Sequence, residues 1–429
     1  MLSVVLFGTM LVLFALNVPI AVGLGIAAAL ALLTIPGVSV EVLVQRMFFG
    51  LDSFLILSVP LFLLLGEVMQ SARITDRLVE FAQALVGRVR GGLGHVSIIT
   101  NMLMAGISGS GTADAAATGV VLMPAMTKAG YRPSFAAALV GAAATIGPII
   151  PPSIIMIIFA SIAGVSIARI FIAGLVPGIL MGLCLMAMTA AIAARRGIAR
   201  GEPTSGTKIV QATRRASLVL VLPLIVVGGI VGGVFTATES AAVGCLYALA
   251  LGLLVYRSLS VRELPEVFRN TALATGRVMF ILATASVFSW ILARGGVPDQ
   301  FAALPFFADA TKPWLILLTL NILLFVLGTV MEAIAILLIT VPMILPIAKA
   351  AAIDPIHLGV VMSFNLTIGL ITPPMGSIMF VLCSIGRVSV PEFAREAWPF
   401  IAVLVAFLLL ITYVPEIVLF LPDLLLGPG

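Results

Sequence analysis

The sequence predicts an all-α polytopic membrane protein built from two inverted repeats. Of its 429 residues, 62% are apolar and 10% are charged, whereas soluble domains average about 45–50% and about 25%. Several apolar stretches approach or exceed the roughly 18 residues that span a bilayer as a helix. Because lipid offers no hydrogen bonds to the backbone, apolar runs of this length must be helical. Lipid is therefore the solvent for most of the chain.

Four passages of the first half recur in the same order roughly 220 residues later, which indicates a duplication. The matching passages are 20–33 with 240–254, 62–71 with 280–289, 101–115 with 321–333, and 146–153 with 369–376. We assign residues 1–194 to the first repeat, 195–216 to a polar cytoplasmic linker and 217–424 to the second repeat.

Each repeat is expected to contain about five spans and one shorter hairpin. The spans lie near 3–16, 18–35, 53–71, 133–163 and 170–193, then near 217–234, 237–256, 275–294, 356–386 and 397–421. The hairpins lie near 93–127 and 313–348. The arms of the first hairpin are about 13–15 residues long, too short to cross a core of about 30 Å. A hairpin that returns to its own side leaves an odd number of crossings per repeat, so the second repeat enters the membrane upside down.

The distribution of Lys and Arg supports this parity. The predicted topology places 18 of the 23 Lys and Arg residues on one side, and the remaining five are Arg46, Arg169, Arg294, Lys312 and Lys349. Positive charge accumulates in cytoplasmic loops. We therefore expect both termini outside and the linker between the halves in the cytoplasm. The first hairpin would enter from the cytoplasm and the second from outside, with residues 36–51 and 258–273 along the membrane interface.

The two hairpin turns are rich in Gly, Ser and Thr. Glycine lets the backbone turn and exposes carbonyl oxygens, and hydroxyl oxygens are further ligands for a hard cation such as Na⁺. A single turn of this kind also fits simple packing of small residues. Its recurrence in both halves favours a sodium or substrate site. The turn residues are Ser108, Gly109, Ser110, Gly111, Thr112, Gly328 and Thr329.

The fourth span of each half contains paired prolines that must break the helix. Proline removes a backbone donor and clashes with the preceding turn, so carbonyl groups are left free to bind a cation. The half-helix that follows presents N–H groups and a positive dipole to a carboxylate. One such kink also fits a purely structural role, but two favour a binding site. The residues are Thr145, Gly147, Pro148, Pro151 and Pro152, then Asn365, Thr367, Gly369, Thr372, Pro373 and Pro374.

Two carboxylates lie just past the hairpin turns, at Asp114 and Glu332. Acidic residues inside membrane segments are costly and usually functional. Each is expected to support a cation site, to ligate the ion directly, or to cap the adjoining helical arm.

An enzymatic function is not expected. Gly106-Ile107-Ser108-Gly109 fits the string of rhomboid-type intramembrane proteases, whose serine needs a histidine on another helix. His95 and His357 are the only histidines, at the edges of a hairpin arm and a span, and the second turn lacks the serine. No cofactor other than Na⁺ as the coupling ion and no nucleic-acid partner is expected.

The motifs together resemble the large permease (DctM-type) subunit of TRAP transporters. They are PLFLLLGEVM (60–69), ISGSGTADAAATG (107–119), IGPIIPPSIIM (146–156), FTATESAAVG (235–244), LGTVMEA (327–333) and ITPPMG (371–376). The resemblance implies Na⁺-coupled uptake of an organic acid, such as a C4-dicarboxylate or a sugar acid like sialic acid. It also implies two protein partners: a separate four-helix membrane subunit (DctQ-type) and a periplasmic substrate-binding protein (DctP-type).

The resemblance further implies an elevator motion. Both hairpins and both broken helices would move as one body against a scaffold of the first two and last spans of each half. Carried onto this sequence, each cation site would lie between the hairpin turn of one half and the broken helix of the other. A stand-alone Na⁺-coupled dicarboxylate or anion symporter is the alternative function, and a channel is disfavoured because no selectivity ring repeats.

Overall fold

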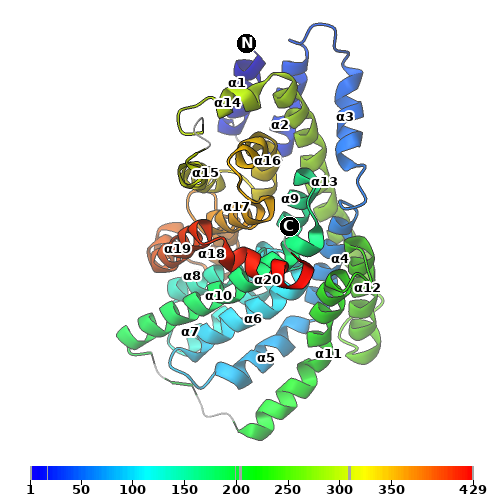
Figure 1. The fold of residues 1–429 in the computed structure, drawn as a ribbon. Coiled ribbons are helices and arrows are strands. Elements are labelled where there is room, and N and C mark those ends of the chain that lie inside the picture. The colour runs from blue at the N-terminus through cyan, green and yellow to red at the C-terminus, as the bar shows by residue number, and fades with distance from the viewer. Residues whose placement is uncertain (1, 17, 199, 202–204, 308–310, 428–429) are drawn as a thin grey trace.

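The computed structural model describes residues 2–16, 18–198, 200–201, 205–307 and 311–427. These residues form helices numbered α1 to α20 and contain no strand longer than an isolated bridge between Arg90 and Arg200 (Figure 1). Among the described helices, six are long and apolar enough to cross a membrane. The predicted class, an all-α polytopic membrane protein, is confirmed.

The first repeat contains α1 to α10. Their bounds are Leu2–Ala15, Ile20–Leu32, Glu41–Leu51, Ser58–Ser71, Ile74–Val86, Gly92–Ser108, Gly111–Lys128, Pro133–Ala144, Ile154–Ala163 and Ile167–Arg195. Helices α6 and α7 form the first hairpin. Helices α8 and α9 are the two parts of the first broken helix.

The second repeat contains α11 to α20. Their bounds are Gly206–Val231, Ala237–Ala250, Leu264–Arg294, Val297–Ala302, Pro313–Gly328, Ala333–Ala350, Pro355–Gly369, Ser377–Gly386, Val390–Tyr413 and Glu416–Leu426, and a π-helical segment at Leu251–Val255 extends α12. Helices α15 and α16 form the second hairpin, and α17 and α18 form the second broken helix.

Helix contacts recur with the two halves exchanged, as repeats related by a two-fold axis require. Helix α2 packs on α13, and its equivalent α12 packs on α4. The second arm of each hairpin packs on the second part of the broken helix of the other half. Helix α7 packs on α18, and α16 packs on α9. The two repeats are thus interlocked rather than separate domains.

The helices fall into two groups. We call α1–α4 and α11–α13 the outer group, and α6–α10 with α15–α20 the hairpin group; α3 stands at the edge beside α13 (Figure 1). The last span of each half packs mainly on the hairpins and broken helices rather than on the first two spans, and the predicted scaffold of the motion stays a prediction. Helix α10 packs on α6, α9, α17 and α19, and α19 packs on α8 and α17, while α4 and α13 complete the outer group.

Small residues on α10 explain this position. A Cβ atom at Gly174 would lie 2.4 Å from the carbonyl oxygen of Ile149, and one at Gly178 would lie 2.4 Å from a side-chain carbon of Ile150. Small residues let membrane helices approach closely. The α10 backbone therefore packs directly against the break of the first broken helix.

Three further boundaries differ from the prediction. Residues 264–273 do not form a separate interfacial helix but begin α13, because no helix breaker separates them from the span. The last predicted span ends at Tyr413, because Pro415 disfavours helical backbone at Val414, and α20 follows as a separate helix. Helix α5, between α4 and the first hairpin, was not predicted at all, although its apolar residues recur at helical spacing.

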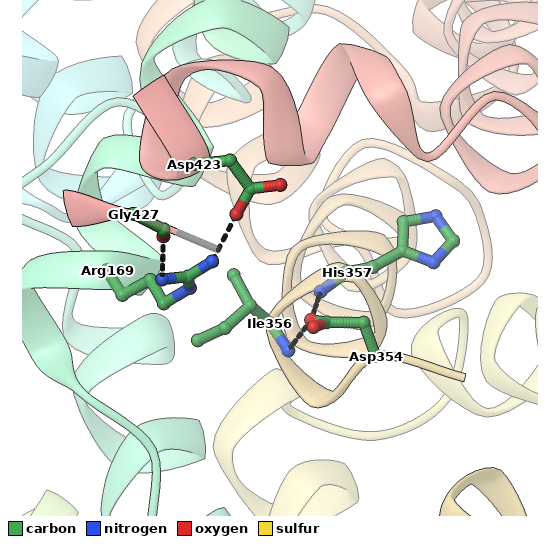
Figure 2. A network of polar contacts seen from close by, with 6 residues as sticks. All are labelled: Arg169, Asp354, Ile356, His357, Asp423 and Gly427. Atoms are coloured by element: carbon green, nitrogen blue, oxygen red, sulfur yellow. Dashed lines mark hydrogen bonds and ion pairs between the residues drawn. The ribbon is translucent and has the colours of Figure 1, made fainter. Parts of the chain in front are cut away.

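Two charged contacts hold the ends of the hairpin group together. Arg169, near the start of α10, pairs with Asp423 of α20 and donates to the carbonyl oxygen of Gly427 at 2.7 Å (Figure 2). Arg196, just after α10, pairs with the buried carboxylate of Glu396 on α19 at 2.6 Å. Each contact joins α10, or the residue just after it, to a helix of the second repeat.

The inverted insertion can be tested by cysteine labelling in a chain whose Cys184, Cys245 and Cys383 are replaced by Ala. Ser39→Cys and Arg262→Cys lie in exposed positions of the loops that follow the second span of each repeat. We expect a membrane-impermeant maleimide to reach Ser39→Cys only from the periplasmic face and Arg262→Cys only from the cytoplasmic face, because an inverted repeat places equivalent loops on opposite sides. Labelling of both from one face would contradict the inversion.

Candidate ion and substrate site

The first hairpin turn is built around Gly109, which ends α6 in the left-handed region with φ +61°. A Cβ atom at this position would lie 2.3 Å from the carbonyl oxygen of Pro152 in the first broken helix. Only glycine allows both the turn and this approach. The turn is therefore seated on the break that follows it in sequence.

Hydroxyl groups and one carboxylate complete the turn. Ser110 caps α7 by accepting from the N–H of Ala113, and its Oγ lies 3.2 Å from the Oγ1 of Thr112. Ser108 donates its hydroxyl to Asp114 Oδ1 at 2.6 Å. Asp114 is fully buried. Its hydrogen bond to Ser108 fixes the position of this carboxylate next to the turn.

The second carboxylate oxygen of Asp114 faces the break. A Cβ atom at Gly147 would lie 2.5 Å from Asp114 Oδ2, and this oxygen has no hydrogen-bond partner among the described residues. A buried polar atom without a partner is uncommon and requires an explanation such as a bound water or ion. Asp114 is thus placed to support a cation at the junction of turn and break.

The first break runs from Thr145 to Ser153, and all of these residues are buried. Ser153 caps α9 by accepting from the N–H of Met156 and donates to the carbonyl oxygen of Pro148 at 2.6 Å. Thr145 donates to the carbonyl oxygen of Ala142 at 2.7 Å. A hydroxyl that donates its proton to a carbonyl keeps lone pairs that can bind a cation.

The second junction repeats this arrangement with fewer side-chain groups. A Cβ atom at Gly369 would lie 2.5 Å from the carbonyl oxygen of Gly328, so the turn and the break are again in backbone contact. Met375 donates its N–H to the carbonyl oxygen of Thr329 at 2.9 Å. The Thr329 and Thr372 hydroxyls both donate to carbonyl groups of their own helices. Both junctions contain a cis bond between the paired prolines.

Asn365 and Thr367 lie in α17, before the second break. Asn365 donates to the carbonyl oxygen and to the Oδ1 of Asn321 on α15, both at 2.9 Å, and Asn321 donates to Thr412 on α19. This buried amide pair joins the hairpin arm to the broken helix and to α19. Asn365 thus positions the second hairpin, and its Oδ1 has no partner among the described residues. Thr367 donates to the carbonyl oxygen of Phe364 at 2.8 Å.

Each turn is in backbone contact with the break of its own half, at Gly109 with Pro152 and at Gly328 with Gly369, and the first turn also lies against Ile378 of the other half at Gly111. The predicted placement of each cation site between the turn of one half and the broken helix of the other stays a prediction. The expectation that a carboxylate caps a hairpin arm is wrong. Neither carboxylate caps a helix through its side chain: Ser110 caps α7, and Glu332 begins α16 without a side-chain cap bond. The fold brings the predicted residues into two clusters, one in each half.

The two junctions differ in exposure. Pro374 and Met375 of the second break are exposed, as is Glu332 beside the second turn, whereas the first break is closed on all sides. Each junction combines backbone carbonyl oxygens, hydroxyl oxygens and the start of a half-helix, α9 or α18. Such a site suits a small cation together with a carboxylate. Inverted repeats with paired hairpins and broken helices define a membrane carrier.

The chain belongs to the tripartite ATP-independent periplasmic transporters, as their DctM component. The family model for this component matches residues 7–417. The chain is 38% identical over 424 residues to the sialic acid TRAP transporter large permease protein SiaM of Vibrio cholerae, covering 99% of both chains. It is 38% identical over 401 residues to the C4-dicarboxylate TRAP transporter large permease protein DctM of Pseudomonas aeruginosa, covering 93% of both.

A third relative is the 2,3-diketo-L-gulonate TRAP transporter large permease protein YiaN of Escherichia coli, 34% identical over 407 residues and covering 94% of this chain and 95% of the relative. The fold is similar to the YdaH transporter of Alcanivorax borkumensis, with a TM-score of 0.56, 14% identity and coverage of 97% of this chain and 98% of that one. The family and these relatives are transporter permeases, so the prediction that the protein is not an enzyme is confirmed.

The seating of the first turn can be tested with Gly109→Ala and the matched control Gly164→Ala. Both glycines have positive φ, at +61° and +69°, but a Cβ at Gly164 meets nothing within 4 Å. The control should lose only the about 1–2 kcal/mol that left-handed backbone costs a residue with a Cβ. Gly109→Ala should lower the thermal midpoint in detergent further and abolish transport, because the turn must leave the Pro152 carbonyl. Equal effects of the two changes would contradict the seating.

Proposed function

We propose that this protein is the large membrane subunit of a TRAP-type carrier that takes up a small organic acid together with Na⁺. The observation that supports the proposal most is the pair of junctions, where a glycine turn meets a proline break in each half. Irregular backbone at membrane depth is tolerated where it lines a polar cavity or is buried in protein. Two such places, related by the repeat, suit a carrier that binds its cargo between them.

In this proposal each junction holds Na⁺. The first supplies Ser108, Ser110, Thr112 and Thr145 hydroxyls with backbone carbonyls of the Gly147–Pro148 segment, and Asp114 compensates the charge. The second supplies Thr329 and Thr372 with carbonyls around Gly328 and Gly369. Na⁺ couples to uptake by preferring the anion-loaded site, because a ligand shifts an equilibrium only by its differential affinity.

The cargo is an organic acid anion of the C4-dicarboxylate or sugar-acid class. Relatives named for sialic acid, C4-dicarboxylate and 2,3-diketo-L-gulonate transport support this range. The N-termini of α9 and α18 begin at the two breaks and supply positive dipole ends to carboxylate groups. We place the cargo between the two breaks.

The hairpin group moves as the transport body against the outer group, and both termini lie in the periplasm of the inner membrane. The crossed packing of α7 on α18 and α16 on α9 supports this division, since it ties both junctions into one body. The partners are a small DctQ-type four-helix membrane subunit and a DctP-type periplasmic binding protein that delivers the cargo.

Reconstituted uptake tests the coupling. Purified protein with the small subunit and a cognate binding protein in liposomes should accumulate the labelled acid only under an inward Na⁺ gradient. Equal uptake with K⁺ in place of Na⁺ and without the binding protein would instead support the stand-alone symporter. Unitary currents in planar bilayers would indicate a channel and contradict both carrier functions.

Site variants connect uptake to the junctions. Ser108→Leu and Thr329→Leu should each reduce the uptake rate by at least about tenfold, which corresponds to about 1.4 kcal/mol of lost binding, because each removes an oxygen and fills the turn. Thr213→Leu, at an exposed position of α11, is the control and should keep normal uptake. Membrane insertion and the elution profile of all three should match the parent chain. Full activity in both junction variants would exclude these turns as the site.

A further inference from the structure

A cavity unrelated to the two junctions lies on the face where the predicted topology places the cytoplasm. Its volume is about 480 Å³. Its walls come from α5, the start of α6, the segment between α7 and α8, the linker after α10, and the first turns of α11. The isolated bridge between Arg90 and Arg200 holds the linker beside the loop that precedes α6. The cavity therefore lies where the outer group meets the hairpin group.

The lining is polar and basic. Arg200, Lys208 and Arg215 contribute three positive charges, and Gln83, Gln211 and Tyr131 contribute further hydrogen-bonding groups. Glu80 is the acidic member of the lining, and it lies 3.4 Å from Arg215 with both side chains exposed. An exposed pair of this kind is weak, so Arg215 can exchange it for a bound anion.

Aromatic and charged contacts fix the wall that contains Tyr131. Tyr131 stacks on Phe135 with ring centroids 6.1 Å apart, and the guanidinium of Arg196 lies 4.5 Å from the centre of the Phe135 ring. Arg196 in turn pairs with Glu396 of α19. The opposite wall is α11 of the outer group. An occupant of the cavity would thus contact both groups of helices.

Apolar side chains border the basic lining. Leu93 and Ile198 line the cavity together with the three basic groups, and both are partly exposed. Apolar groups next to basic groups at a membrane surface match a lipid, whose phosphate meets the bases and whose acyl chains meet the apolar side chains. A soluble phosphate compound without acyl chains would not contact these apolar side chains.

We propose that this cavity binds the phosphate-bearing headgroup of an anionic phospholipid from the cytoplasmic leaflet, through Arg200, Lys208 and Arg215. The cytoplasmic leaflet is rich in anionic lipid, and basic groups near its surface attract it. The site is separate from the ion and substrate junctions. Its occupancy does not depend on whether transport is driven by Na⁺.

Lipid binding to the purified full-length chain tests the proposal. Native mass spectrometry would compare phosphatidylglycerol with phosphatidylcholine for the parent chain and for the triple variant Arg200→Gln, Lys208→Gln, Arg215→Gln. The triple variant should bind phosphatidylglycerol at least about tenfold more weakly, because each basic group near an anionic lipid contributes about a factor of five. The matched control is Arg262→Gln, Arg269→Gln, Arg277→Gln, which removes the same charge from the same predicted face. It should bind like the parent chain.

A second variant separates the cavity from its charge. Ala129 is exposed and lines the cavity, so Ala129→Trp fills the space while keeping all three bases. It should also lose phosphatidylglycerol, with an unchanged thermal midpoint in lipid-free detergent. Equal losses in the two triple variants, or normal binding by Ala129→Trp, would overturn the proposal. Complete displacement of the lipid by glycerol 1-phosphate at equal concentration would overturn the lipid assignment in favour of a soluble phosphate.

Discussion

The fold depends on one constraint: a backbone N–H or carbonyl group inside a bilayer must find a partner within the protein. Both broken helices interrupt the regular backbone hydrogen bonds of a helix, and nearby groups bond to some of the carbonyl oxygens that are left. The carbonyl oxygen of Pro148 accepts from Ser153, and that of Leu370 accepts from the N–H groups of Ile378 and Met379. At the first break, α10 packs directly on Ile149 and Ile150 and the hairpin turn lies on Pro152, whereas Pro374 and Met375 of the second break are exposed. The hairpin group therefore forms around the two breaks.

The repeats have diverged in the way they hold their hairpins. When the halves are aligned on the paired prolines, Asn365 of the second half corresponds to Ala143 of the first. In the second half Asn365 joins Asn321 to the broken helix. In the first half Asn101 has an Oδ1 without a partner among the described residues, and Asp114 instead joins turn and break. The first junction thus depends on a buried carboxylate, and the second on an amide pair remote from the turn.

The sequence predicted the helical class, the duplication and the positions of both turns and both breaks. It did so because glycine and proline act on the backbone locally, whatever surrounds them. It missed α5, a short amphipathic helix between two strongly apolar segments. It did not show that α10 and α19 pack mainly on the hairpins and broken helices. Their apolar surfaces fit either neighbour equally, since lipid tails and helix faces are alike in polarity.

Composition and local backbone chemistry thus determined that this chain enters a membrane, folds twice in the same pattern and interrupts its helices at the two proline pairs. Tertiary structure alone decided that each turn rests on the break of its own half. It also decided that Ser108 rather than a helix end holds Asp114, and that α10 belongs to the hairpin group. The physical reason is that a turn or break depends on a few residues that are neighbours in sequence. Which helices pack together depends instead on close packing between residues far apart in sequence.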